Sequence, residues 1–254
     1  YAKWIWADAC AEMDSYADFY DTFVYTGEKT EIQISADSNY VLFINGEFVN
    51  SGQYPDFPHY KVYDTIDISA YCKKGENSLA ITVWYYGLSN TITYYKGNAS
   101  LRYEVYTDTQ CLCFSDASTL SRISPEYKNG YRKIITNQLG LSFMYYAVNR
   151  ADWKRGSVTG FSDSTIVEQQ LAMFHRPVKK VVIGDRCHAQ LIKSDQKKHF
   201  LYDIGREEVG YFTIKLYSSA WQKITVCYGE HIAAGCVRRK IDNRDFSFEM
   251  VVDE

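Results

Sequence analysis

The chain has 254 residues, of which 46% are hydrophobic, 16% aromatic and 23% charged, and its formal net charge is −3 at pH 7. This length allows one large or two modest domains. The small negative charge, without a dense stripe of lysine and arginine, excludes nucleic acid as a partner, and no apolar run approaches the roughly 20 residues that span a bilayer, so we expect no membrane partner.

Seven cysteines are spread along the chain without a disulfide framework: Cys10, Cys72, Cys111, Cys113, Cys187, Cys227 and Cys236. None of their spacings is the CxxC of a zinc site. We therefore expect free thiols, which are typical of a reducing compartment and favour the cytoplasm. The first residue is Tyr1 rather than methionine, so a preceding signal peptide stays open and the compartment stays unassigned.

Apolar and polar residues alternate in the first half of the chain, which is the period-2 pattern of β-strands. Asn45-Gly46 follows the run Val41–Ile44, and both residues tolerate positive φ, so the pair predicts a two-residue hairpin turn. Alternation continues in Ser78–Tyr86 and in Ser100–Tyr106. We expect each of these runs to be a strand with one face toward a core.

The second half shows fewer regular patterns. Asp163–Phe174 predicts a helix of a turn or two, with Asp163 or Ser164 as its N-cap. Alternation returns in Phe212–Leu216, Ile224–Tyr228 and Asp245–Val252. Many short strands with regular turns predict an all-β sandwich architecture, and an exposed apolar strand edge at its end would allow a homodimer.

Two groups of motifs stand in a fixed order along the chain. The first is ISADSNYVLFING at Ile34–Gly46, followed by VYDTIDISAYCKKGENSLAITVWYYG at Val62–Gly87. The second is DIGREEVGY at Asp203–Tyr211, followed by Tyr228-Gly229-Glu230. In this order the motifs resemble the non-catalytic N-terminal region of bacterial α-L-rhamnosidases, and the resemblance covers most of the chain.

The resemblance implies two antiparallel β-sandwich units. Residues 1–180 would form a jelly-roll or galactose-binding-like sandwich, and residues 181–254 the start of a concanavalin-like sandwich that is incomplete. In this family an α-helical barrel further along the chain hydrolyses terminal α-L-rhamnose with inversion, and these residues do not include that barrel. The resemblance therefore implies an accessory fragment, inactive by itself, whose partners are the missing catalytic domain and a rhamnose-containing glycan.

The residues themselves give no independent catalytic site. Neither a Gly-x-Ser-x-Gly elbow nor an HExxH motif is present. A glycosidase needs two carboxylates on either side of the sugar, and the acidic residues that come into question by charge alone are Asp37, Asp56, Asp64, Asp203 and Glu230. We expect structural roles for all five, and we assign no catalytic residue.

Sugar binding is the more reasonable activity for such a sandwich, because an aromatic face can stack on a sugar ring while polar groups fix its hydroxyls. The loop Gly52–Tyr60 supplies both elements, and a neighbouring strand adds further aromatic side chains. The predicted carbohydrate-binding residues are Tyr54, Asp56, His59, Trp84 and Tyr86. The alternative is that this loop packs against the missing barrel.

No cofactor is required by any motif. The resemblance allows calcium, which some rhamnose-binding modules attached to such enzymes use to hold the sugar hydroxyls; calcium prefers several oxygen ligands, and Asp37 with Asn39, or Asp56, could contribute them. Three functions remain open: an accessory part of a rhamnosidase, an independent lectin-like module, and a purely structural or oligomer-forming module.

Overall fold

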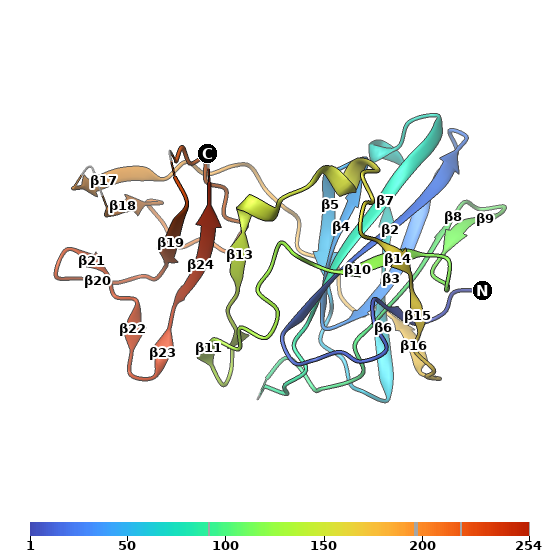
Figure 1. Cartoon of the computed structure of the whole chain (residues 1–254), viewed down its shortest axis with the longest axis horizontal. Helices are drawn as coiled ribbons and strands as arrows, with labels where there is room; N and C mark the ends of the chain where they lie inside the picture. The colour runs from blue at the N-terminus through green and yellow to red at the C-terminus, as the bar shows by residue number, and fades with distance from the viewer. Residues whose placement is uncertain (91, 196–197, 219, 254) are drawn as a thin grey trace.

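The computed structural model describes residues 1–254 except 91, 196–197, 219 and 254. Figure 1 shows a large β-sandwich built from the N-terminal two-thirds of the chain, beside smaller sheets from the C-terminal third. Within the described residues the helices are three short 3-10 turns, η1 (Ser69–Tyr71), η2 (Ala147–Asn149) and η3 (Asp152–Arg155). None of them is long and apolar enough to cross a membrane. The predicted all-β class is confirmed.

One face of the sandwich is a seven-stranded sheet. Its strands lie in the order β15 (Thr165–Ile166), β1 (Ile5–Trp6), β8 (Ser100–Tyr106), β3 (Glu31–Asp37), β6 (Tyr60–Asp67) and β16 (Ala172–His175), and β9 (Cys111–Phe114) also pairs with β8. All pairs are antiparallel except β16 with β6. The pocket described below is lined by one residue from each of β3, β6 and β8.

The opposite face is a six-stranded sheet. Its strands lie in the order β14 (Ser162–Asp163), β10 (Leu120–Ile123), β2 (Ser15–Tyr25), β7 (Gly75–Tyr85), β4 (Asn39–Ile44) and β5 (Glu47–Gly52). The predicted hairpin joins β4 to β5, and Asn45 and Gly46 take φ values of 54° and 76°, as a two-residue turn of this type requires. Both central residues thus adopt the left-handed region that the sequence predicted.

The core lies between these two sheets and follows the predicted alternation. In β7 the side chains of Leu79, Ile81 and Val83 are all at most 1% exposed. Trp6, from the opposite sheet, contacts Phe19 at a ring distance of 5.8 Å. Burying an aliphatic or aromatic side chain of this size contributes about 1.5–3 kcal/mol, so the inward faces of the two sheets hold the sandwich together.

The predicted helix at Asp163–Phe174 is wrong. The segment forms β14, β15 and β16, and it crosses from one sheet to the other between Asp163 and Thr165. Ser164 caps no helix; its hydroxyl donates to the carbonyl of Thr119 at 2.7 Å. Pairing with strand edges satisfies the backbone here, and tertiary pairing outweighs the weak local helix signal.

The C-terminal part of the chain forms smaller sheets. A three-stranded sheet has the order β13 (Met144–Tyr146), β24 (Ser247–Val252) and β19 (Gln222–Cys227). The other strands form two-stranded pairs: β11 (Ile134–Thr136) with β12 (Gly140–Leu141), β17 (Gln190–Ser194) with β18 (Phe200–Asp203), β20 (Ile232–Ala233) with β21 (Cys236–Val237), and β22 (Lys240–Ile241) with β23 (Arg244–Asp245). The strands predicted at Ile224–Tyr228 and Asp245–Val252 are present as β19 and β24. Because β13 pairs with β24 in parallel, a segment before residue 180 belongs to this sheet, and the domain boundary near residue 180 stays a prediction.

The predicted strand at Phe212–Leu216 does not form. Residues 176–189 and 204–218 contain neither strand nor helix, and Phe212 is 60% exposed. An alternating sequence becomes a strand only where a neighbouring strand accepts its hydrogen bonds, and the described part of this segment has none.

Residues 181–189 and 204–218 are expected to be the first sites of proteolysis, because few buried contacts oppose their local opening. Brief digestion with trypsin should cut after Arg186 and Arg206 before it cuts after Arg102, which lies within β8. Mass spectrometry of the time course would measure the order. Early cleavage at Arg102 would contradict the expectation that the sandwich is the more stable part.

Aromatic side chains join the sandwich to the C-terminal sheet. Tyr16 of β2 stacks on Tyr127 with ring centroids 4.4 Å apart. Tyr127 contacts Phe143 at 6.2 Å, and Phe143 stacks on Phe248 of β24 at 4.7 Å. The stack is continuous from the second sheet of the sandwich to the centre of the three-stranded sheet, so it fixes the two parts against each other.

Candidate functional site

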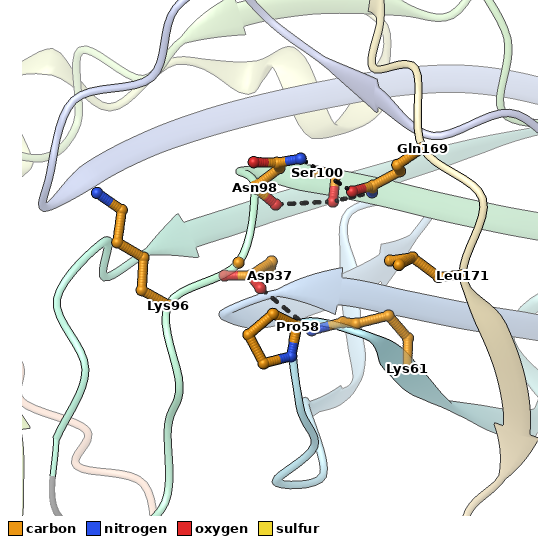
Figure 2. A pocket seen from close by; sticks show the side chains of 9 residues that line it. Asp37, Pro58, Lys61, Lys96, Asn98, Ser100, Gln169 and Leu171 are labelled. Carbon is orange, nitrogen blue, oxygen red and sulfur yellow. Dashed lines mark hydrogen bonds and ion pairs between the residues drawn. The ribbon is translucent and has the colours of Figure 1, made fainter.

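A polar pocket of about 290 Å³ opens where β3 ends and β8 begins. Figure 2 shows the side chains that line it. They come from four separate stretches of the chain: Asp37, Pro58, Lys61, Lys96, Gly97, Asn98, Ser100, Gln169 and Leu171. This volume is near the lower end of the range for small-molecule sites, about 300 Å³ and upward, so the pocket suits one small ligand.

A buried ion pair forms one side of the pocket. The Lys61 ammonium donates to Asp37 Oδ2 at 3.2 Å and to Asp56 Oδ1 at 2.7 Å. Each carboxylate has a second set of partners: Asp37 Oδ1 accepts from the Tyr94 hydroxyl at 2.6 Å, and Asp56 Oδ2 accepts from Gln53 Nε2 at 2.8 Å. Because each carboxylate accepts hydrogen bonds from Lys61 and from a second partner, these side chains are fixed in position before any ligand binds.

Burial raises the pKa of the Asp37 carboxyl above its ordinary value, and the positive charge of Lys61 opposes that rise. Burial and the charge of Asp37 both raise the pKa of Tyr94, so its hydroxyl stays protonated and remains a donor to Asp37. The arrangement therefore keeps a hydrogen-bonded carboxylate and an ammonium side by side at the pocket wall.

The opposite side of the pocket is a ring of neutral polar groups. Asn98 Nδ2 donates to Gln169 Oε1 at 3.3 Å, and Gln169 Nε2 donates to the Ser100 hydroxyl at 3.0 Å. The Ser100 hydroxyl in turn donates to the carbonyl of Asn98 at 3.0 Å. Amides and hydroxyls both donate and accept, so this side can bind hydroxyl groups of either orientation.

Gly97 brings the backbone against the buried carboxylate. A Cβ atom at this position would collide with Asp37 Oδ2, and the Gly97 carbonyl accepts from the Tyr85 hydroxyl at 3.0 Å. Only a residue without a side chain allows this close approach. The pocket wall therefore depends on glycine here for space rather than for an unusual φ.

Two exposed aromatic rings belong to residues that are adjacent in sequence to pocket-lining residues. Phe57 and Tyr95 stack with ring centroids 4.8 Å apart and are 38% and 45% exposed. Their chain neighbours Pro58 and Lys96 line the pocket itself. An exposed aromatic face next to a set of polar donors and acceptors is the combination that binds a ring with one apolar face and hydroxyls around it.

Comparison with solved structures returns rhamnosidases over most of the chain. A GH78-family rhamnosidase from Bacillus sp. GL1 matches 70% of this chain with a TM-score of 0.65 and 25% identity. The α-L-rhamnosidase of Aspergillus terreus matches 99% with a TM-score of 0.70 and 20% identity, and the α-L-rhamnosidase of Streptomyces avermitilis, solved with L-rhamnose, matches 95% with a TM-score of 0.71 and 14% identity. This chain has the fold of the N-terminal region of an α-L-rhamnosidase. The predicted resemblance is thereby confirmed.

The match covers only part of those enzymes. The chain spans 20% of the Bacillus protein, 31% of the Aspergillus protein and 25% of the Streptomyces protein. No protein-family model and no curated protein matches the sequence. What this chain shares with the rhamnosidases is therefore the fold of this region.

The predicted sugar-binding residues do not form one site. Asp56 lies in the buried ion pair beside the pocket, while the exposed ring of His59 packs on Phe57 at 5.7 Å. Tyr54 points elsewhere and stacks under the guanidinium of Arg176 at 4.9 Å. Their assignment as ligand contacts stays a prediction, and Asp56 and His59 are the two that lie next to pocket-lining residues.

Trp84 and Tyr86 lie at the start of the aromatic stack that joins the two parts of the molecule. Trp84 stacks on Tyr16 at 5.1 Å, and its Nε1 donates to Asp14 Oδ1 at 2.8 Å. Tyr86 contacts the edge of Trp84 at 4.5 Å. Both residues are half-buried, so their surroundings indicate packing between the sandwich and the C-terminal sheet.

Lining residues that the sequence reasoning missed are Lys61, Asn98, Ser100 and Gln169. Lys61 directly precedes the motif at Val62–Gly87, and no sequence pattern marked it as buried. Lys61 lies near the start of β6 and is buried, a position in which a charge needs a partner. Asn98 and Gln169 are brought together by β8 and by the crossover segment that had been predicted as helix.

A second group of charges ties residues 176–180 to the sandwich. The Asp64 carboxylate accepts from Arg176 Nη1 at 3.0 Å and from Lys180 Nζ at 2.9 Å, and the Tyr40 hydroxyl donates to the same carboxylate. Lys180 also donates to the carbonyl of Ser51 at 2.6 Å. These contacts hold the chain as it leaves the sandwich.

The remaining acidic residues that came into question have local roles. Asp203 Oδ1 accepts from the Gly205 amide at 2.8 Å, which stabilises a turn, and Glu230 is exposed. Among the described residues no group of three or more His, Cys, Asp or Glu side chains has the arrangement to hold a metal ion. The seven cysteines are free.

Proposed function

We propose that this chain is an accessory, non-catalytic part of a glycoside hydrolase of the α-L-rhamnosidase type. The observation that carries the proposal is the match to three such enzymes over 70–99% of this chain, together with its span of only 20–31% of theirs. A region that is shared but small relative to the whole enzyme fits a role in positioning the catalytic part or the glycan.

The state of the buried carboxylates supports a non-catalytic role. A hydrolytic pair needs one carboxylate free to protonate the leaving group and one free to activate water. In the sandwich, Asp18 pairs with Arg122 at 3.2 Å and Glu126 with Lys154 at 3.5 Å. Asp37, Asp56 and Asp64 have the lysine and arginine partners described above, and charges paired in this way stabilise structure.

The proposal is tested by assaying the purified chain with an aryl α-L-rhamnoside. We expect no hydrolysis above the uncatalysed rate, because the buried carboxylates named above are paired with lysine or arginine. Hydrolysis by this chain that is lost in Asp37→Asn or Asp64→Asn would overturn the proposal. The same assay with Asp152→Asn, an exposed acidic residue, is the matched control.

We further propose that the pocket beside Phe57 and Tyr95 binds one sugar ring of a glycan. The supporting observation is the set of amide, hydroxyl, carboxylate and ammonium groups that line the pocket, together with the stacked rings of Phe57 and Tyr95, the sequence neighbours of Pro58 and Lys96. A hexose-sized ring would place its apolar face on the aromatic side and its hydroxyls toward Asn98 and Gln169, with each hydroxyl able to donate and accept.

Calorimetric titration with L-rhamnose tests the pocket. We expect saturable binding in the wild-type chain and a loss of about two- to tenfold in Tyr95→Ala, since stacking on one aromatic ring contributes about 0.5–1.5 kcal/mol. Tyr217→Ala, which removes a more exposed tyrosine (86% against 45%) far along the chain, should bind as the wild type does. Equal affinity of all three proteins would exclude this pocket, and no binding at all would favour a purely structural module.

A further inference from the structure

Lys61 is 3% exposed, and its side chain lies in the wall of the polar pocket. Lysine is almost never buried unless its charge is paired. Here the ammonium lies between two carboxylates that come from different elements, Asp37 at the end of β3 and Asp56 in the loop before β6. Carboxylate oxygens are also ligands that divalent metal ions such as calcium prefer.

The ammonium retains binding capacity toward the pocket. A lysine has three N–H donors, and within the part of the chain that the structure describes its acceptors are Asp37 Oδ2 and Asp56 Oδ1. Figure 2 shows the end of the Lys61 side chain beside Asp37 and Pro58. The third donor is therefore available to an oxygen atom of a ligand.

The overall charge of the pocket favours a neutral ligand. Asp37 and Asp56 carry two negative charges, and Lys61 and Lys96 carry two positive ones. An anion would gain little from a balanced group of charges, and a metal ion would be repelled by an ammonium that already lies between its two carboxylate ligands. A polyhydroxylated neutral ring can accept from the ammonium and donate to the carboxylate at once.

We propose that Lys61 takes the place of a divalent cation in this pocket and binds a hydroxyl oxygen of a neutral sugar directly, so that binding needs no metal ion. This inference rests on the proposed role of the pocket in glycan binding. Lys61 is then the residue that determines specificity, because it selects an oxygen acceptor at one position of the ring and excludes calcium from the same position.

The first experiment uses the wild-type chain. Its affinity for L-rhamnose is measured by calorimetry in the presence of EDTA and in the presence of millimolar calcium chloride. Equal affinity in both is expected. A need for calcium would overturn the inference while leaving the proposed sugar-binding function intact, so the two failures are distinguishable.

The second experiment uses Lys61→Met, which keeps the aliphatic stem and removes the charge, with Lys96→Met as the control at the exposed edge of the pocket. We expect Lys61→Met to lose about tenfold to a hundredfold in rhamnose affinity. It should also gain saturable binding of Tb³⁺, used alone as a probe of the vacated cation position, with luminescence sensitised by Tyr94, which hydrogen-bonds to Asp37. Lys96→Met should gain none.

Two results would contradict the inference. One is a folded Lys61→Met chain with wild-type rhamnose affinity, and the other is terbium binding by the wild-type chain at this pocket. Lys61→Met could unfold in the absence of metal. In that case we expect calcium to raise the melting temperature of Lys61→Met and to leave that of the wild type unchanged. An equal response of both proteins overturns the inference. If Lys61→Met binds terbium but the wild-type chain binds no rhamnose, only the proposed contact between Lys61 and the sugar is refuted.

Discussion

Replacing Asp64 with asparagine is expected to lower the free energy of unfolding by about 3 kcal/mol, because breaking a buried ion pair leaves its partners without their counter-charge. The Asp64 side chain is 1% exposed and contacts both Arg176 and Lys180. Asparagine keeps the size of the side chain and removes the charge that holds these two cations. Urea unfolding at pH 7 measures the difference.

Asp152→Asn is the matched control for this substitution. Asp152 pairs with Arg155 at 3.2 Å on the surface, where the two side chains are 67% and 61% exposed. Exposed pairs contribute about 0–1 kcal/mol. If Asp64→Asn cost no more than Asp152→Asn, the contacts of residues 176–180 with the sandwich would not contribute to stability, and the role given to them here would be wrong.

The Asp64 effect is expected to depend on pH. Burial would raise the pKa of Asp64, but hydrogen bonds from Tyr40, Lys180 and Arg176 and the charge of Lys180 outweigh burial and leave the pKa below its ordinary value. A carboxyl group whose pKa is lowered in the folded state stabilises it above the unfolded pKa, near 4, and loses that contribution as the pH falls through the folded pKa. The difference in unfolding free energy between wild type and Asp64→Asn should therefore shrink below about pH 4. A constant difference from pH 7 to pH 3 would contradict this.

The sandwich was largely predictable because its signals are local. Asn45-Gly46 specifies a hairpin by the φ values that its two residues tolerate, and the apolar positions of Ser78–Tyr86 specify which face of β7 meets the core. The segment Asp163–Phe174 was mistaken for helix because its pairing partners, β10, β1 and β6, lie far away in sequence. Local propensity contains no information about such partners.

The pocket was not predictable for the same reason. Lys61 is recognisable as a binding residue only when Asp37 and Asp56 are known to lie on either side of it, and those contacts depend on how β3 and the loop before β6 are placed. Asp56 and His59 were named from composition, and in the structure Asp56 pairs with the pocket-lining Lys61 while His59 follows the pocket-lining Pro58. Composition could not show that Tyr54 turns away toward Arg176.

Trp84 lies in aromatic packing against Tyr16, and its assignment as a sugar contact stays a prediction. Trp84→Ala is expected to lower the free energy of unfolding by about 3 kcal/mol, because a half-buried tryptophan loses its stacking on Tyr16 and leaves a cavity. The loss of the hydrogen bond from Trp84 Nε1 to Asp14 adds to this cost, since Asp14 is fully buried. Thermal unfolding followed by circular dichroism measures the change.

Trp84→Phe separates the two contributions to that loss. Phenylalanine keeps an aromatic ring against Tyr16 and removes the donor to Asp14, so it should cost about 1.5–3 kcal/mol, the value of a hydrogen bond to a charged group. Rhamnose affinity measured at a temperature where all variants are folded should be the same in the wild type, Trp84→Ala and Trp84→Phe. A Trp84→Ala chain with unchanged stability and no affinity for rhamnose would instead indicate that Trp84 contacts the sugar. The proposal that the pocket at Lys61 binds the sugar would then be wrong.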